Sequence, residues 1–172
     1  PEPSFLYVGK QLEAKGLDTL FEAARQCNFP IHVCGTGPYS EETENAATEV
    51  SNLHYHGYVT DDVLTRLRQD ATAAVVPSIW MENSPLTIYE SFAVGLPVIG
   101  SDIGGIPELV NETRGRLVEP KDPHDLADAM RELASAPETV RSLQQHALAW
   151  AEKQTLSDHV DQLCDVYSRA MS

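Results

Sequence analysis

Two glutamates, Glu82 and Glu90, bracket a predicted helix start within residues 75–100, a stretch typical of a buried strand, a polar loop, a helix start and a second buried strand. The first turn of a helix offers unpaired N–H groups and the positive end of the helix dipole, which together favour a phosphate. Carboxylates repel an anion, so they are better placed to accept hydrogen bonds from hydroxyl groups that flank it. Hydroxyl groups on both sides of a diphosphate describe a nucleotide sugar, and the pattern predicts a site for one.

A pair of lysines, Lys10 and Lys15, follows the first apolar run of the chain directly after Gly9. The glycine lets the backbone pass close to a ligand, and both lysines are within reach of a diphosphate. Two solvated surface lysines are the ordinary alternative. The formal net charge of −14 makes a local pair of positive charges notable, because the chain holds only 12 lysines and arginines against 26 acidic residues.

Three other patterns are weaker. The turn Gly35-Thr36-Gly37-Pro38 lacks the third glycine of a dinucleotide fingerprint, because Ser40 holds that position, so we expect a turn packed near a ligand. His54 and His56 share one face of a predicted strand, but with no third ligand nearby we predict a packed or hydrogen-bonded pair and no metal. Serines and histidines are available for a hydrolytic triad, yet the sequence has no Gly-x-Ser-x-Gly elbow.

The composition predicts one globular domain that does not bind nucleic acid. The 172 residues are 42% hydrophobic and 22% charged, and the acidic balance disfavours nucleic acid and, more weakly, a direct role at a membrane surface. No apolar stretch approaches the ~20 residues that span a bilayer. The chain opens on Pro-Glu-Pro-Ser, so we expect a piece of a longer protein. Its three cysteines, Cys27, Cys34 and Cys164, form no CxxC pair, which favours reduced thiols in the cytoplasm.

Short apolar runs alternate with helical patterns over residues 1–120. Because most runs lack polar alternation, they are typical of parallel strands covered on both faces, and we predict strands at 5–8, 31–34, 53–56, 73–76, 97–100 and 116–118. Between them, a helical stripe at i, i+3, i+4 and i+7 joins Leu17, Leu20, Phe21 and Ala24. Thr60 is expected to cap a helix that ends near Arg68. Ser84 is expected to cap a second helix, with Pro85 in its first turn. The alternation predicts an α/β fold with a doubly wound parallel sheet.

Residues 121–172 are predicted to be helical. One helix starts at Asp122-Pro123 with Leu126, Met130 and Leu133 on its apolar face, and a second starts at Pro137. The second carries Val140, Leu143, Ala147 and Trp150, and a last helix carries Val160, Leu163, Cys164, Tyr167 and Met171.

Ligands of open parallel sheets bind outside the carboxyl ends of the strands. Four predicted loops lie there, at 9–16, 35–39, 57–61 and 78–87, and they hold the unusual residues described above. Their convergence at one edge of the sheet is the strongest argument from the sequence for a binding site.

The chain resembles the C-terminal, donor-binding half of retaining GT-B glycosyltransferases of the large group 1 type, known as family 4. Nearly the whole chain takes part in the resemblance. Its segments are Tyr-Val-Gly-Lys with Lys-Gly (7–16), Cys-Gly-Thr-Gly-Pro (34–38), His-Gly-Tyr-Val (56–59), Val-Pro-Ser (76–78), the Glu82 and Glu90 pair, and Gly-Leu-Pro-Val-Ile-Gly-Ser-Asp-Ile-Gly-Gly-Ile-Pro-Glu (95–108). Each segment is weak alone, but six in the right order are specific.

The resemblance implies a role for each matching residue. Lys10 and Lys15 would grip the diphosphate, with Lys10 standing where the family usually has arginine and therefore lacking its bidentate geometry. Glu82 would contact the donor sugar's hydroxyl groups and Glu90 the ribose. The catalytic group would be Glu82, Lys10 and Lys15, and donor binding would add Gly9, Tyr58, Val59, Ser84, Leu86, Thr87 and Glu90.

Pro85 stands where many members of the family carry glycine, which removes one N–H donor and leaves the amides of Leu86 and Thr87 to hold sugar and phosphate. The base would lie near residues 57–59 against the backbone. The resemblance also implies transfer without a metal or other cofactor, because the lysines and the helix N-terminus would stabilise the leaving diphosphate.

The resemblance further implies that residues 1–172 form a single donor-binding domain, whose acceptor-binding N-terminal partner domain is not part of this chain. The isolated chain is then expected to bind donor weakly and to transfer nothing. A cytoplasmic location follows, with peripheral membrane contact through the other domain left open, and relatives that build cell-surface polysaccharides make that pathway an expectation. Two alternatives remain at this point: a sugar-nucleotide epimerase of the same architecture, and a non-catalytic interaction domain with a vestigial site.

Overall fold

The computed structural model describes residues 2–154. The last helix predicted from the sequence, with its apolar stripe from Val160 to Met171, lies outside the described residues.

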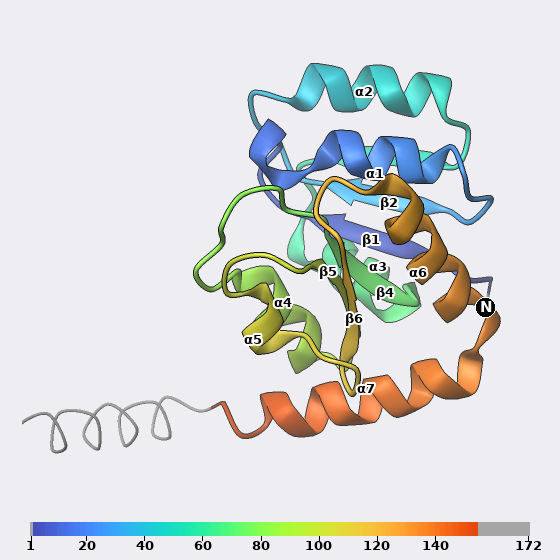
Figure 1. The fold of residues 1–172 in the computed structure, drawn as a ribbon. Coiled ribbons are helices and arrows are strands. Elements are labelled where there is room, and N and C mark those ends of the chain that lie inside the picture. The colour runs from blue at the N-terminus through green and yellow to red at the C-terminus, as the bar shows by residue number, and fades with distance from the viewer. Residues whose placement is uncertain (1, 155–172) are drawn as a thin grey trace, which may run out of the picture.

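A six-stranded parallel sheet forms the centre of the fold (Figure 1). The strands are β1 (Phe5–Val8), β2 (Ile31–Cys34), β3 (Leu53–Gly57), β4 (Ala73–Val76), β5 (Val98–Ser101) and β6 (Gly115–Val118). Their spatial order is β3-β2-β1-β4-β5-β6, so the chain winds outward from β1 to one edge and then from β4 to the other. This order confirms the predicted doubly wound sheet, and it creates a crevice where the winding reverses, between β1 and β4.

Helices cover both faces of the sheet (Figure 1). Helices α1 (Leu17–Ala24), α2 (Ser40–Glu49) and α6 (Pro123–Ser135) pack on one face, and α3 (Asp61–Asp70), α4 (Leu86–Ala93) and α5 (Ile106–Leu109) on the other. Helix α7 (Pro137–Ala151) contributes to both apolar clusters, through Val140 and Leu143 on one side and Ala147 on the other. A short 3-10 turn, η1 (Glu13–Lys15), precedes α1.

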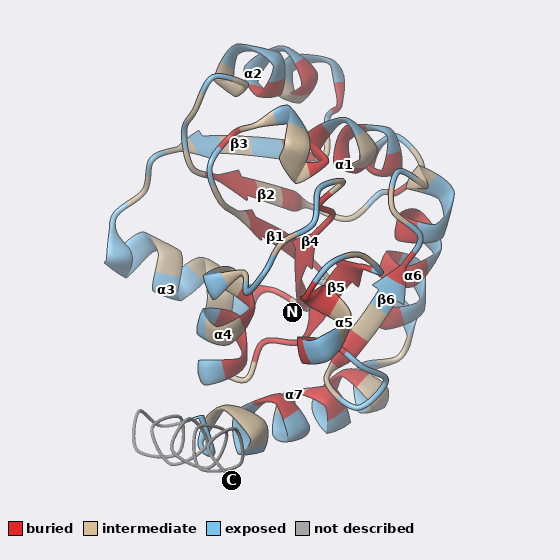
Figure 2. Ribbon diagram, turned by 60° about the vertical axis from the view of Figure 1, so that its left-hand side comes forward, coloured by how far each residue is buried: buried red, intermediate tan, exposed pale blue. Residues whose placement is uncertain are grey.

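Burial follows the predicted apolar stripes. The α1 residues Leu17, Leu20, Phe21 and Ala24 are all buried, and the central strands are buried along their length, whereas the edge strand β3 alternates with exposed residues (Figure 2). The helix predicted to start at Asp122-Pro123 is α6, and the Asp122 side chain caps it by accepting hydrogen bonds from the backbone N–H groups of His124 and Asp125. The apolar patterning therefore places both layers of helices.

Two predicted caps are corrected by the structure. Helix α4 begins at Leu86, with Pro85 in extended backbone at the N-cap position (φ −68°, ψ 111°), so Ser84 is not the cap and its hydroxyl instead donates to the Tyr89 hydroxyl at 3.2 Å. Thr60 does occupy the N-cap position of α3, but its side chain makes no capping bond and the helix continues to Asp70.

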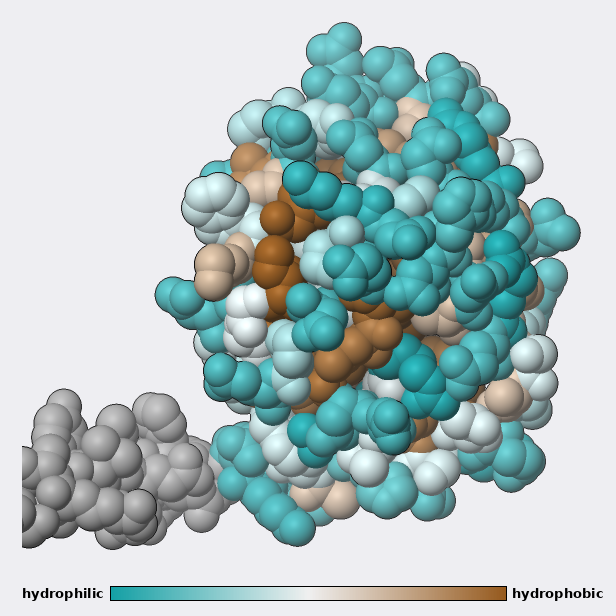
Figure 3. Space-filling view, viewed as in Figure 1, coloured by the Kyte–Doolittle hydropathy of each residue, from teal (hydrophilic) through white to brown (hydrophobic). Residues whose placement is uncertain are grey.

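The surface seen in Figure 3 is dominated by hydrophilic residues, with hydrophobic ones confined to smaller areas between them. This agrees with the acidic composition of the chain. Among the described residues, no helix has the length and apolar character that crossing a membrane requires.

Candidate functional site

Two adjacent cavities open at the carboxyl ends of the strands, of about 160 Å³ and 260 Å³. The first lies over β1 and β4, and the second over β1 and β2; both are lined by Val8, Gly9 and Lys10. All four loops predicted to converge contribute to them. The predicted meeting of these loops at one edge of the sheet is therefore confirmed.

An ion pair between Lys15 and Glu82 lies in the wall of the first cavity. The Glu82 side chain is 18% exposed and the Lys15 side chain 32%, so both are partly shielded from solvent. Ser78 also donates a hydrogen bond from Oγ to Oε1 of Glu82 at 2.8 Å. The carboxylate is thus fixed by one charged and one neutral donor.

The loops that carry Lys15 and Glu82 are joined through the backbone of Ala14. Its carbonyl accepts a hydrogen bond from the backbone N–H of Ile79 at 3.1 Å and one from the Ser78 hydroxyl at 3.3 Å. Gly16 makes this approach possible, because its φ of +73° suits glycine and a Cβ there would lie 1.8 Å from the Pro77 carbonyl oxygen. Close backbone packing therefore brings Lys15 to Glu82.

Tyr7 forms the floor of the first cavity. It is 3% exposed, and its hydroxyl donates to the Lys10 carbonyl oxygen at 3.1 Å. Burial, and to a smaller degree the negative charge of Glu82, raises the pKa of the Tyr7 phenol, so this group stays a neutral donor. A Cβ at Gly9 would come within 3.1 Å of the Tyr7 hydroxyl oxygen, so the absence of a side chain keeps the turn close to this floor.

The N-terminus of α4 forms another wall of the first cavity through Pro85 and Thr87. The Thr87 hydroxyl donates to the Val8 carbonyl oxygen at 3.2 Å, which ties the helix to the end of β1. The backbone N–H of Ile88 bonds to the Pro85 carbonyl at 3.0 Å, whereas the earlier N–H groups of Leu86 and Thr87 have no acceptor within the helix. These two donors and the helix dipole favour an anion.

The second cavity is less polar. Cys34, Leu64 and Val59 supply apolar wall, while Thr36, Asp61 and the largely exposed ring of Tyr58 contribute polar atoms. Burial raises the pKa of the Cys34 thiol to about 11, with Arg68 opposing the shift. An apolar wall beside a few polar groups suits an aromatic heterocycle.

Glu90 differs from its predicted setting. The apolar residues near Glu90 in the sequence, Ile88, Phe92 and Ala93, indicate a partly buried carboxylate, but the Glu90 side chain is 53% exposed, and it is not part of the lining of either cavity. The partner that burial would have required does exist: the Arg68 guanidinium of α3 forms an ion pair with it. The apolar neighbours Ile88 and Phe92 point into the core, and the helical turn directs Glu90 away from them.

The structure brings most of the predicted site residues together. Gly9, Lys10, Lys15, Glu82 and Thr87 line the first cavity, and Tyr58 and Val59 line the second. Ser84, Leu86 and Glu90 lie beside the cavities on exposed surface. The site residues named from the sequence did not include Tyr7, Leu64, Thr36, Asp61 and Ser78, although the last three lie in loops predicted to form the site.

Ser78 had a signal in the sequence, because it ends the Val-Pro-Ser motif directly after a strand. The structure shows that its hydroxyl donates to Glu82.

The histidines form a cluster outside the two cavities. Both predicted histidines pack against His32, which the sequence did not single out: Nδ1 of His32 and Nε2 of His56 are 2.9 Å apart, and the ring centres of His32 and His54 are 5.3 Å apart. Among the residues that the structure describes, no three His, Cys, Asp or Glu side chains are grouped to hold a metal ion.

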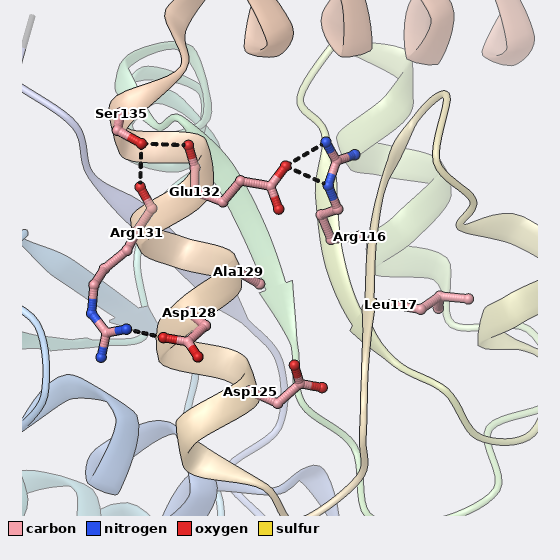
Figure 4. A pocket seen from close by; sticks show the side chains of 8 residues that line it. All are labelled: Arg116, Leu117, Asp125, Asp128, Ala129, Arg131, Glu132 and Ser135. Atoms are coloured by element: carbon pink, nitrogen blue, oxygen red, sulfur yellow. Dashed lines mark hydrogen bonds and ion pairs between the residues drawn. The ribbon is translucent and has the colours of Figure 1, made fainter.

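A further hollow of about 500 Å³ lies between β6 and α6 (Figure 4). Four of its charged side chains form two ion pairs, Arg116 with Glu132 and Arg131 with Asp128. None of the predicted site residues lines it. Size alone therefore does not identify the functional site of this domain.

Comparison with known proteins identifies the family. Residues 1–150 match the family model described as glycosyl transferases group 1. The D-rhamnosyltransferase WbpZ of Pseudomonas aeruginosa is 32% identical over 151 residues, which make up 84% of this chain and 39% of that protein. The O-antigen chain mannosyltransferase C of Escherichia coli is 28% identical over 170 residues, 95% of this chain and 46% of that protein.

Solved structures agree on the fold. Anabaena HepE, solved in complex with UDP, superposes with a TM-score of 0.85 at 20% identity, over 96% of this chain and 48% of that one. The sucrose-phosphate synthase of Thermosynechococcus elongatus has a TM-score of 0.84 at 26% identity, over 99% of this chain and 46% of that one. The doubly wound sheet is thus a Rossmann-like half of a GT-B fold. The chain belongs to the group 1 glycosyl transferases, and it spans less than half the length of these relatives.

Proposed function

We propose that this chain is the donor-binding domain of a retaining glycosyltransferase that moves a sugar from a nucleoside diphosphate to an acceptor hydroxyl. The observation that carries the proposal is the Lys15–Glu82 ion pair in a cavity that also contains the N-terminus of α4 and adjoins a second, more apolar cavity. Cations, helix amides and a carboxylate match a diphosphate flanked by hydroxyl groups, and the second cavity accommodates the base. The solved HepE complex with UDP supports a nucleotide ligand.

Each side chain has a role in the proposed reaction. The bond between the anomeric carbon and the diphosphate oxygen breaks and its electron pair leaves with the diphosphate. The acceptor oxygen bonds to the same carbon, and its proton passes to the leaving diphosphate. Lys10, Lys15 and the amides of Leu86 and Thr87 stabilise the negative charge that develops on the diphosphate. Glu82 holds hydroxyl groups of the donor sugar without forming a covalent bond to it.

A thermal-shift panel of UDP-, GDP- and ADP-sugars on the 172-residue chain tests the proposal. One nucleotide is expected to raise the unfolding temperature, since a ligand that binds only the folded state stabilises it. In the same assay, Glu82→Gln should reduce the advantage of the sugar nucleotide over the free nucleoside diphosphate. No shift with any nucleotide diphosphate would refute the proposal and favour a vestigial site.

The length of the relatives suggests where the other half of the reaction takes place. This chain covers 39% and 46% of two of them. We propose that the acceptor is bound by a further domain of the same protein, and that the 172-residue chain alone transfers no sugar. Sugar transfer by the isolated chain, measured with radiolabelled donor, would contradict this. A full-length protein that turns over donor without any acceptor would instead be an epimerase or hydrolase.

A further inference from the structure

The ion pair between Arg68 and Glu90 connects α3 and α4 next to the segment that the two cavities share. Arg68 lies one helical turn beyond Leu64, which lines the second cavity, and Glu90 lies one turn beyond Thr87, which lines the first. Thr87 in turn donates to the carbonyl of Val8, a residue common to both cavities. The pair therefore lies one turn beyond the parts of α3 and α4 that line the two cavities, and neither Arg68 nor Glu90 itself lines them.

The two partners have very different environments. The Arg68 side chain is 14% exposed, whereas that of Glu90 is 53% exposed. Nε of Arg68 is buried, and among the described residues it has no hydrogen-bond partner. The guanidinium is close enough to the buried Cys34 thiol for its charge to lower the pKa of that thiol against the effect of burial.

This arrangement does little to stabilise the folded state. An ion pair with a half-exposed carboxylate adds little to the free energy of unfolding, and a buried N–H group without an acceptor lowers it. A buried cation that holds an exposed carboxylate does have one clear effect: it restricts the carboxylate to a single position. Only one carboxylate oxygen, Oε2, takes part in the ion pair, which leaves Oε1 free to accept.

We infer that Arg68 is a positioning residue that holds the Glu90 carboxylate for the ribose hydroxyl groups of the bound nucleotide. The inference rests on the proposed function, because the ribose of a nucleotide sugar joins the base to the diphosphate and so lies between the two cavities. Arg68 itself does not touch the ligand. It holds the Glu90 carboxylate in one position beside α4, with Oε1 available to hydroxyl donors.

The test compares a ribonucleotide with its dideoxy analogue. Binding of GDP or UDP, whichever binds the 172-residue chain more tightly, is measured by calorimetry beside binding of the matching 2′,3′-dideoxynucleoside diphosphate. We expect the ribonucleotide to bind at least about tenfold more tightly, because hydrogen bonds to a charged group are being compared with none. Arg68→Met should remove most of this preference and leave the affinity for the dideoxy compound unchanged.

Further variants separate positioning from folding. Arg68→Lys should restore part of the preference, since it keeps the charge but not the planar fork. Glu90→Gln, on exposed surface, should reproduce the loss even if Arg68→Met folds poorly. Arg66→Met is the matched control, because Arg66 is exposed on the same helix and has no ion pair among the described residues. It should change neither affinity.

The outcomes distinguish this inference from the proposed function. Equal weakening of both nucleotides by Arg68→Met would mean direct contact with the phosphates or base and would overturn the positioning role. A wild-type chain that binds both nucleotides equally would also overturn it, while leaving the diphosphate site standing. A chain that binds neither nucleotide would refute the proposed function and this inference together.

Discussion

The Lys15 ammonium pairs with the Glu82 carboxylate across 67 positions of sequence, in the wall of a cavity at the carboxyl ends of β1 and β4. Two separate loops thus place opposite charges in contact at one point of the fold. A diphosphate that enters this cavity offers the lysine a more highly charged partner, and a hydroxyl group offers the glutamate a donor in exchange. The pair therefore keeps both groups in place for the ligand proposed above.

Replacing Lys15 by alanine is expected to weaken binding of a nucleoside diphosphate by about tenfold to a hundredfold, the effect of losing one charged hydrogen-bond donor. The fold should survive, because a partly exposed ion pair contributes only ~0–1 kcal/mol to stability. Calorimetry and a urea titration measure the two effects. Lys153→Ala, in an exposed position after α7, is the control, and equal affinity in Lys15→Ala would remove the diphosphate assignment.

Gly16→Ala is expected to disrupt the contact between the two loops. The positive φ of +73° disfavours alanine, and its Cβ would lie 1.8 Å from the Pro77 carbonyl oxygen. Backbone strain alone costs about 1–2 kcal/mol, and the clash adds to it while moving Lys15 away from Glu82.

Gly95→Ala is the matched control for Gly16→Ala. Its φ is +72°, but its nearest neighbour would be an ordinary 3.5 Å away. The thermal unfolding temperature and the nucleotide affinity should both fall further in Gly16→Ala than in Gly95→Ala. Equal losses in the two variants would contradict the close-packing argument.

Replacing Arg114 is expected to lower the stability of the fold without changing the affinity for nucleotide. Its Nε and Nη2 donate to the Leu109 carbonyl at 3.1 Å and 2.8 Å, and its guanidinium lies 5.0 Å from the centre of the Trp150 ring. Arg114→Met is expected to lower the free energy of unfolding by about 1–3 kcal/mol, because the hydrogen bonds and the cation–π contact are lost together.

Urea titration measures this loss, and Arg141→Met serves as the control. Arg141 has a 68% exposed side chain paired within its own helix, so its loss should change stability by less than about 0.5 kcal/mol. Nucleotide affinity should stay at the wild-type value in both variants. A drop in affinity for Arg114→Met would show that the α5–α7 contact reaches the site.

The histidine cluster predicts a loss of stability in mild acid. Burial, and then the neighbouring His56 and His54, lower the pKa of His32, and Asp70 opposes this shift with a smaller effect. Burial and His54 likewise lower the pKa of His56. The unfolded chain therefore binds more protons than the folded one as the pH falls through about 6.5, so stability decreases below that pH.

The variant His32→Gln/His56→Gln should flatten this dependence between pH 7.5 and 5.5, while exposed His146→Gln should not. Urea midpoints at the two pH values give the comparison. An equal slope in wild type and the double variant would assign the acid loss to other groups.

Much of the fold could be predicted because its signals are local. The apolar runs that became β1, β2 and β4 have the predicted bounds, and the stripe through Leu17 and Phe21 faces the core. Helix starts were less predictable, because a proline at the N-cap and a proline in the first turn look alike in sequence. The backbone of Pro85 is extended, and α4 starts after it.

The candidate site was predictable in part for the same reason. In a parallel sheet the loops that follow the strands meet at one edge. The proximity of Lys15 and Glu82 could therefore be predicted from the sequence alone. The Arg68–Glu90 pair could not, because it depends on how α3 and α4 lie across the sheet, a matter of tertiary packing. The role of Tyr7 was equally hidden, since a tyrosine in a strand is ordinarily read as core.

The turn formed by Val8, Gly9 and Lys10 lines both cavities, so it contacts both ends of any ligand that fills them. A substitution in this turn changes the contacts with both ends of the ligand. The binding preference for one end therefore cannot be changed there without affecting the other. New preferences for one end can be acquired only from the outer walls: the segments after β2 and β3 for the second cavity, and the β4–α4 loop for the first. In this domain, selectivity can therefore diversify at the periphery while the central turn stays fixed.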